Sequence, residues 1–169
     1  GFRIMNDSGY FKYNQYDLGH VLNTKNTIGV ENGSSFLSSV CNDSTKGASW
    51  SNWSLGTNTY FGLVVLAHEI GHMFSATHSF NAYGGNSSDL NACSNAWGLE
   101  TAVEPGSGIT IMSYNGTCFS PNQNIKTGRK LYLHFKNLEQ IFNFLENISK
   151  CDVKSPIVNN LPTVFAGED

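Results

Sequence analysis

The chain contains two segments whose apolar residues recur at helical spacing, separated by stretches rich in Gly, Asn and Ser. The first segment, YFGLVVLAHEIGHMFSA, has apolar residues every three or four positions and predicts a helix over residues 60–76. The second predicts a core-packing helix over residues 137–149, and Asn137 followed by Gln140 resembles a capping box with Asn as the N-cap. The predicted apolar face of this second helix consists of Leu138, Ile141, Phe142, Leu145 and Ile148.

Short apolar bursts between turn residues predict strands over residues 18–23, 27–30 and 34–40. Residues 77–120 are expected to be mostly loop, and a chain of 169 residues suits one domain with a single core.

Composition narrows the function classes. Hydrophobic residues make up 40% of the chain and charged residues 14%, which is typical of a globular protein rather than a disordered one. The net charge is −3 and no cluster of basic residues exceeds GRK at 128–130, so no nucleic-acid or anionic-membrane partner is expected. The longest apolar run, near residues 63–67, is too short for membrane insertion.

Four cysteines, none in a C-x-x-C pair, predict two disulfides in an exported protein that is secreted or displayed at the cell surface. Four free thiols in a cytosolic protein are the alternative. Three pairings exist for four cysteines, and we favour Cys41–Cys151 with Cys93–Cys118.

The stretch AHEIGHMFSATHSF carries three of the five histidines. His68 and His72 are four residues apart and therefore project from one face of the predicted helix. Glu69 points about 100° around the helix, where it can reach a metal-bound water without being a ligand. His78 can join the pair only if the helix stops near residues 74–76, because ten helical residues would carry it about 15 Å away.

Three histidines and a water form the open zinc geometry of a catalytic site. With Glu69 as general base and then general acid, the pattern predicts a zinc endopeptidase that works through a zinc-activated water. The alternative is a helix with ordinary histidines.

Gly71 lies inside the predicted helix, where glycine costs about 1 kcal/mol relative to alanine. A close approach of backbone or substrate at this position would explain the glycine.

HEIGHMFSATH, followed by TIMSYNG, resembles the metzincin motif H-E-x-x-H-x-x-G-x-x-H and its methionine turn. YDLGHVLNT, TIGV and SVCNDSTKG precede the zinc helix in the order of reprolysin-like (adamalysin) metalloproteases, and EPGSGITIMSY resembles bacterial secreted members. The resemblance covers residues 13–150. It implies one catalytic Zn²⁺, with calcium left unassigned, and protein or peptide substrates. The implied metal ligands and turn methionine are His68, His72, His78 and Met112.

The fold implied by the resemblance is α/β, more narrowly α+β, with a metzincin-like catalytic domain over residues 1–152. A twisted mixed sheet would lie over the zinc helix, and an irregular lower subdomain would end in a C-terminal helix. The N-terminal strands of the sheet are expected to be missing, and the exposed edge predicts dimerisation. Residues 153–169, with two of the four prolines, are expected to form a linker toward a further module.

Two positions depart from the family pattern. Ser75 replaces the glycine of the turn before the third histidine, which costs on the order of 1 kcal/mol if its φ is positive. Ser79 stands where reprolysins usually carry Asp.

Tyr114 belongs to a Met-x-Tyr motif that also occurs in astacin- and serralysin-like metzincins, which implies a hydroxyl that stabilises the oxyanion. A core tyrosine is the alternative. His20 and His134 are expected to be structural. The alternative function is a zinc-binding but inactive protein-interaction module, against which the intact Glu69 argues.

Overall fold

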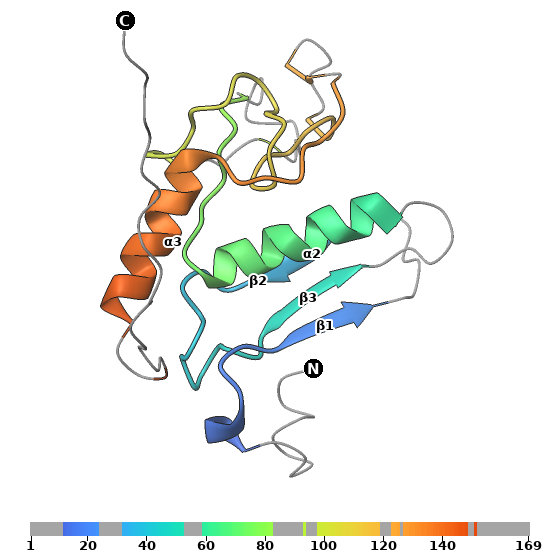
Figure 1. Ribbon diagram of the computed structural model, residues 1–169. Helices are drawn as coiled ribbons and strands as arrows, with labels where there is room; N and C mark the ends of the chain where they lie inside the picture. The colour runs from blue at the N-terminus through green and yellow to red at the C-terminus, as the bar shows by residue number, and fades with distance from the viewer. Residues whose placement is uncertain are drawn as a thin grey trace, which may run out of the picture.

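The computed structural model describes residues 12–23, 32–52, 59–82, 93, 98–118, 123–125, 127–148 and 151. Its elements are η1 (Tyr13–Gln15), β1 (His20–Asn23), β2 (Gly33–Ser35), β3 (Ser49–Asn52), α2 (Thr59–Met73) and α3 (Phe135–Asn147). Helix α2 lies across one face of the sheet, and the loops from residue 98 to α3 lie on the opposite side of α2 (Figure 1). The helix with the H-E-x-x-H pattern therefore lies between a sheet layer and a loop layer.

The sheet has the strand order β1-β3-β2. Strand β1 pairs with β3 in parallel, and β2 pairs with β3 in antiparallel orientation. The described elements thus form a mixed three-stranded sheet with two α-helices, which confirms the predicted α+β fold. The strand predicted over residues 18–23 is present as β1, whereas the strand predicted over 27–30 lies outside the described residues.

The sheet face toward α2 carries mostly small and polar side chains. Gly33 faces α2, and in this register its face is shared by Ser35, Ser49, Ser51, His20 and Leu22. The two ring nitrogens of His20 contact the hydroxyls of Ser49 at 2.6 Å and Ser51 at 2.8 Å. His20 is therefore a structural histidine, as predicted, and the small neighbours let α2 lie close to the sheet.

The strand predicted over residues 34–40 is largely wrong, because β2 ends at Ser35. Ser38 has a φ of +56°, and its N–H donates to the carbonyl of His72 at 3.0 Å. The N–H of Val40 donates to the carbonyl of Met73 at 3.3 Å. The segment after β2 therefore satisfies carbonyls at the end of α2, which a helix leaves without partners, instead of extending the sheet.

The capping box predicted at the start of α3 is also wrong. The N-cap is His134, whose Nδ1 accepts the N–H of Lys136 at 3.3 Å. Asn137 lies inside the first turn and is fully buried. Its Nδ2 donates to the carbonyl of Thr77 at 2.8 Å, so a contact with another segment takes the place of the local cap.

The predicted apolar face of α3 is only partly buried. Three of its five positions are exposed, namely Leu138 (41%), Phe142 (62%) and Leu145 (37%). The side that packs against the rest of the protein carries Asn137, Gln140, Ile141, Phe144 and Ile148. The helix is rotated relative to the prediction because Asn137 and Gln140 both bind Thr77.

Both disulfides favoured from the sequence are present. Cys41–Cys151 joins the segment after β2 to the chain beyond α3, and Cys93–Cys118 packs in a cluster with Phe80. Two disulfides are consistent with an extracellular location. Within the described residues, no helix is both long and apolar enough to cross a membrane.

Candidate active site

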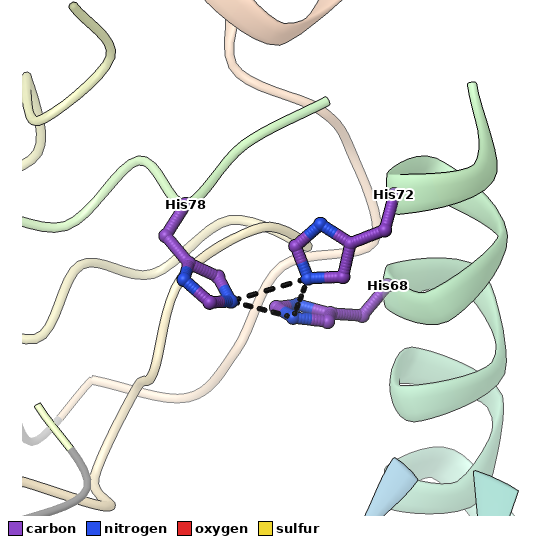
Figure 2. Close-up of side chains that lie close together, drawn as sticks. All are labelled: His68, His72 and His78. Carbon is purple, nitrogen blue, oxygen red and sulfur yellow. Dashed lines mark hydrogen bonds between the residues drawn. The ribbon is translucent and has the colours of Figure 1, made fainter. Parts of the chain in front are cut away.

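Helix α2 and the loop that follows it bring three histidines together. His68 and His72 project from one face of α2, and His78 approaches from the loop, so that their Nε2 atoms converge (Figure 2). The Nε2 atom of His78 lies 3.2 Å from each of the other two. The Nε2 atoms of His68 and His72 are 3.0 Å apart. Three imidazoles that meet in this way are the donor set of a catalytic metal centre.

Backbone carbonyls fix the protonation of two of these rings. The Nδ1 of His68 donates to the carbonyl of Ile111 at 2.8 Å, and the Nδ1 of His72 donates to that of Ala76 at 2.7 Å. Burial lowers the pKa of both rings, and the charges of His72, His78 and Arg129 further lower the pKa of His68. A neutral ring that donates through Nδ1 keeps only a lone pair at Nε2.

These lone pairs test whether the site suits a metal. The Nε2 atoms of His68 and His72 face each other, and neither carries a proton, so their lone pairs repel each other. A cation bound between the two nitrogens removes this repulsion. Tetrahedral zinc with Zn–N distances of about 2.0–2.1 Å places two nitrogen ligands about 3.3 Å apart. The observed separations of 3.0–3.2 Å are close to that value, so the three histidines fit zinc.

The chain reaches His78 through a turn at Ser75. Helix α2 ends at Met73, and Ser75 has a φ of +76°, the left-handed conformation that the family pattern assigns to glycine. The hydroxyl of Ser75 accepts a hydrogen bond from the hydroxyl of Ser38 at 3.1 Å. A serine therefore serves here because its side chain joins the turn to the segment after β2, a contact that glycine cannot make.

This contact predicts different outcomes for two substitutions. Ser75→Ala keeps the left-handed strain and loses the hydroxyl, so it is expected to destabilise the protein by about 1 kcal/mol. Ser75→Gly loses the same bond but removes the strain, so its net effect is expected to be within about 0.5 kcal/mol of zero. Denaturant unfolding of both variants measures the difference, and equal stabilities would contradict the assigned strain.

Helix α3, to which the sequence assigned no chemistry, holds the residue before the third histidine. The Oε1 atom of Gln140 accepts the N–H of Thr77 at 3.0 Å, and its Nε2 donates to the Thr77 hydroxyl at 2.9 Å. On the other side, the hydroxyl of Thr101 donates to the carbonyl of His78 at 2.7 Å. The only sequence signal for this role was N-x-x-Q, which also matches a helix cap.

Ser79, at the position where reprolysins carry Asp, donates its hydroxyl to the carboxylate of Glu104 at 2.5 Å. The other carboxylate oxygen of Glu104 accepts the N–H groups of Ile109 at 2.7 Å and Thr110 at 3.0 Å. The N–H of Ser79 also donates to the carbonyl of Met112 at 3.1 Å. A carboxylate from another loop therefore joins the third-histidine segment to the loop that leads to Met112.

Met112, predicted as the turn methionine, is fully buried beneath α2. A Cβ at Gly71 would lie 2.6 Å from the Met112 sulfur. This contact explains why a glycine is present in the middle of the helix, directly before His72. Packing is the observed role of Met112, and its supporting role under a metal stays a prediction.

Glu69 is buried on the sheet side of the histidines. A Cβ at Gly33 would lie 2.6 Å from Oε1 of Glu69, so the carboxylate lies against the β2 backbone. The sequence offered no signal for Gly33, because the contact depends on how α2 lies on the sheet. Glycine at this position gives the carboxylate its space.

The histidines and Glu69 open into a cleft of about 440 Å³. One wall is β2 with Asn32, and the other wall includes Ile111, Tyr114, Thr117 and Arg129. The ring of Tyr114 packs 4.6 Å from those of His78 and Phe80 and 5.9 Å from that of His68. Tyr114 therefore combines the packing role with a place on the cleft surface.

A mixed sheet, a helix carrying two histidines and a third histidine from the next loop define a metal-dependent hydrolase. Residues 9–135 match metallo-peptidase family M12B, reprolysin-like. The match covers most of the chain, and the protein belongs to this family, which makes it a zinc metallopeptidase of the metzincin type. No curated protein sequence matches the chain.

Proposed function

We propose that this protein is a secreted endopeptidase of bacterial type, with His68, His72 and His78 as zinc ligands. The observation that carries the proposal is the convergence of three Nε2 atoms in a cleft that also contains a buried glutamate. Zinc, when bound, polarises the substrate carbonyl and makes water more acidic. We also propose that residues 1–152 form the catalytic domain and residues 153–169 a linker.

Glu69 is assigned the proton transfers. Its carboxylate accepts a proton from the attacking water and then donates it to the leaving amine. The contact with Gly33 holds the carboxylate beside β2, so both transfers occur at one fixed position next to the histidines. This arrangement needs no covalent intermediate with the protein.

Strand β2 is suited to hold an extended peptide. It is an outer strand, paired only with β3 among the described strands, and it forms a wall of the cleft. A peptide added along such an edge lies across the histidines, because main-chain hydrogen bonds fix its course. The edge beside the site is therefore present in this chain, which favours the peptidase over the inactive zinc-binding module.

The direct test is cleavage of a quenched-peptide library by the protein with one equivalent of zinc and by the chelated protein. Bound zinc at a ratio of one with chelator-sensitive cleavage is expected. One equivalent of zinc without cleavage of any peptide would instead support the inactive binding module. Failure to bind zinc would overturn both functions.

Tyr114 is assigned the stabilisation of the oxyanion. Tyr114→Phe keeps the ring that packs on His78 and Phe80, so zinc affinity is expected to be unchanged. Turnover is expected to fall about 10-fold or more, because a hydrogen-bond donor aimed at the developing charge is lost. Steady-state kinetics beside a zinc titration measure both quantities, and unchanged kcat would remove Tyr114 from the mechanism.

The outer strand β1 supports the proposed dimer. Its Val21 and Leu22 side chains are 37% and 49% exposed, and on its open side β1 has no partner strand among the described residues. The mass in solution at high concentration is expected to exceed that of one chain. A monomer under these conditions would count against dimerisation through this edge.

A further inference from the structure

The cleft wall opposite β2 carries a cation to which the mechanism assigns no role. Among the described residues that line the cleft, Arg129 is the only lysine or arginine. It lies on the same wall as Ile111, Tyr114 and Thr117.

The guanidinium of Arg129 is held in one orientation. Its Nε and Nη2 donate to the carbonyl of Asn115 at 3.2 Å and 2.8 Å, and it lies 4.6 Å from the ring centre of Phe61. The hydroxyl of Tyr60 donates to the carbonyl of Arg129 at 2.5 Å. An arginine fixed in this way loses little conformational entropy when it binds a ligand.

Asn115 is itself anchored, so the support of Arg129 is rigid. The Asn115 side chain is buried, and its Nδ2 donates to the carbonyls of Gly108, Ile125 and Thr127 at 2.8 Å, 3.3 Å and 3.1 Å. These bonds join Asn115 to the backbone just before Arg129, at Ile125 and Thr127, and to the loop at Gly108. Because the loop holds Asn115 in place, the Asn115 carbonyl fixes the position of the Arg129 guanidinium.

No carboxylate of the described residues lies within ion-pair distance of Arg129. The two ion pairs found in the described part of the chain both involve lysines, Lys46 with Asp43 and Lys136 with Glu139. Among the described residues, the half-buried guanidinium of Arg129 contacts the neutral carbonyl of Asn115 and the ring of Phe61, so it has lost hydration without gaining an opposite charge. A ligand carboxylate in the cleft would supply that charge and pair with the remaining N–H donors.

We propose that Arg129 makes this peptidase selective for substrates with an aspartate or glutamate side chain next to the scissile bond. The inference rests on the proposed peptidase function and adds its substrate class. A carboxylate can accept two parallel hydrogen bonds from one guanidinium, whereas asparagine, glutamine and leucine cannot make that charged pair. Arg129 is thus a specificity-determining residue, separate from the proton transfers of Glu69.

The test uses matched quenched peptides in which one of the two residues that flank the cleaved bond is varied. The varied residue is Asp, Glu, Asn, Gln or Leu, and each flanking position is tested in turn. The wild-type protein is expected to cleave one acidic series roughly 10- to 100-fold faster in kcat/KM than its amide counterpart, the size of a charge-assisted hydrogen-bond pair. Arg129→Gln is expected to abolish that ratio, and Arg129→Glu to shift the preference toward basic side chains. Lys130→Gln, which removes the same charge from the exposed neighbouring residue, is expected to keep the ratio.

Binding separates this inference from the proposed function. Dissociation constants of the same peptides are measured on zinc-loaded Glu69→Gln protein, with and without Arg129→Gln, after one equivalent of zinc has shown that each variant is folded. Tighter binding of the acidic peptides that depends on Arg129 supports the inference even if no peptide is cleaved. Equal binding and cleavage of acidic and amide peptides by the wild-type protein would overturn it, as would an acidic preference that survives Arg129→Gln.

Discussion

Replacement of Glu69 by glutamine is expected to lower kcat/KM for peptide cleavage by about 100- to 10,000-fold. Glutamine has the shape of glutamate but cannot accept the proton of the attacking water. Its amide fits the same space against Gly33, where a Cβ would come within 2.6 Å of the side chain. The rings of His68 and His72 are fixed through Nδ1 by the carbonyls of Ile111 and Ala76. Zinc content is therefore expected to stay at one equivalent.

Two companion variants locate the origin of this loss. Glu69→Asp keeps the carboxylate but withdraws it from β2, and an intermediate rate is expected because proton transfer depends on reach. Gly33→Ala keeps the glutamate at position 69, but the added methyl group would occupy the space of its carboxylate. The variant is therefore expected to lower kcat because the carboxylate is displaced. A Glu69→Gln protein that keeps its zinc and cleaves within threefold of the wild-type rate would remove Glu69 from the proton transfers.

The features that could be predicted from the sequence are those coded by local spacing. The period of apolar residues sets helix α2, and the four-residue interval places His68 and His72 on one face. The limited reach of a continuous helix required a stop before His78, and the structure places that stop at Met73 with a left-handed Ser75. Each of these inferences needed only the geometry of one or two turns.

Two local patterns failed because contacts between distant segments outweighed them. Residues 34–40 have a short apolar burst that predicted a strand, but the N–H groups of Ser38 and Val40 bind the carbonyls of His72 and Met73. Asn137 matched a helix cap, but its amide binds Thr77, which lies 60 residues earlier. In both cases the competing partner lies at the end of α2 or just beyond it, and a pattern within one short window contains no information on that partner.

Gly33 and Arg129 could not have been assigned in advance. Gly33 matters because α2 lies close to β2, and Arg129 matters because Asn115 and Phe61 hold it in the cleft wall. Glu104 could not have been assigned either. The sequence shows that Ser79 stands where reprolysins usually carry Asp, but it does not show which distant segment contacts Ser79.

Glu104→Gln is expected to destabilise the protein by about 2–3 kcal/mol and to weaken zinc binding. The carboxylate of Glu104 accepts hydrogen bonds from the hydroxyls of Ser79 and Thr110 and from the N–H groups of Ile109 and Thr110. A glutamine amide replaces one acceptor oxygen with a donor, so at least one buried donor loses its partner. Since Ser79 follows His78, the loss reaches the third histidine as well as the loop of Met112. Glu100→Gln, at an exposed glutamate of the same loop, is the matched control and is expected to be neutral.

The pH dependence of stability gives an independent readout of Glu104. Burial raises the pKa of this carboxyl, but the hydrogen bonds from Ile109, Ser79 and Thr110 outweigh burial and hold the pKa below its ordinary value of 4.5. A carboxyl with a lowered pKa in the folded state stabilises the protein above its unfolded pKa, and this contribution is lost as the pH falls through the folded value. Denaturant unfolding between pH 7 and pH 3 is therefore expected to show a steeper loss of stability for the wild type than for Glu104→Gln. Parallel curves would contradict a charged Glu104.

Moving the carboxylate back to its family position tests why the serine is tolerated. Ser79→Asp alone places a second acid beside Glu104 and is expected to destabilise the protein, because two buried like charges repel each other. When Ser79→Asp is combined with Glu104→Gln, one acid remains and the glutamine amide can donate to it. The double variant is expected to be more stable than the sum of the single effects by at least about 1 kcal/mol, the coupling of residues in direct contact. Additive effects would mean that the two positions do not share one structural role, and that Ser79 is tolerated for a reason other than the Glu104 carboxylate.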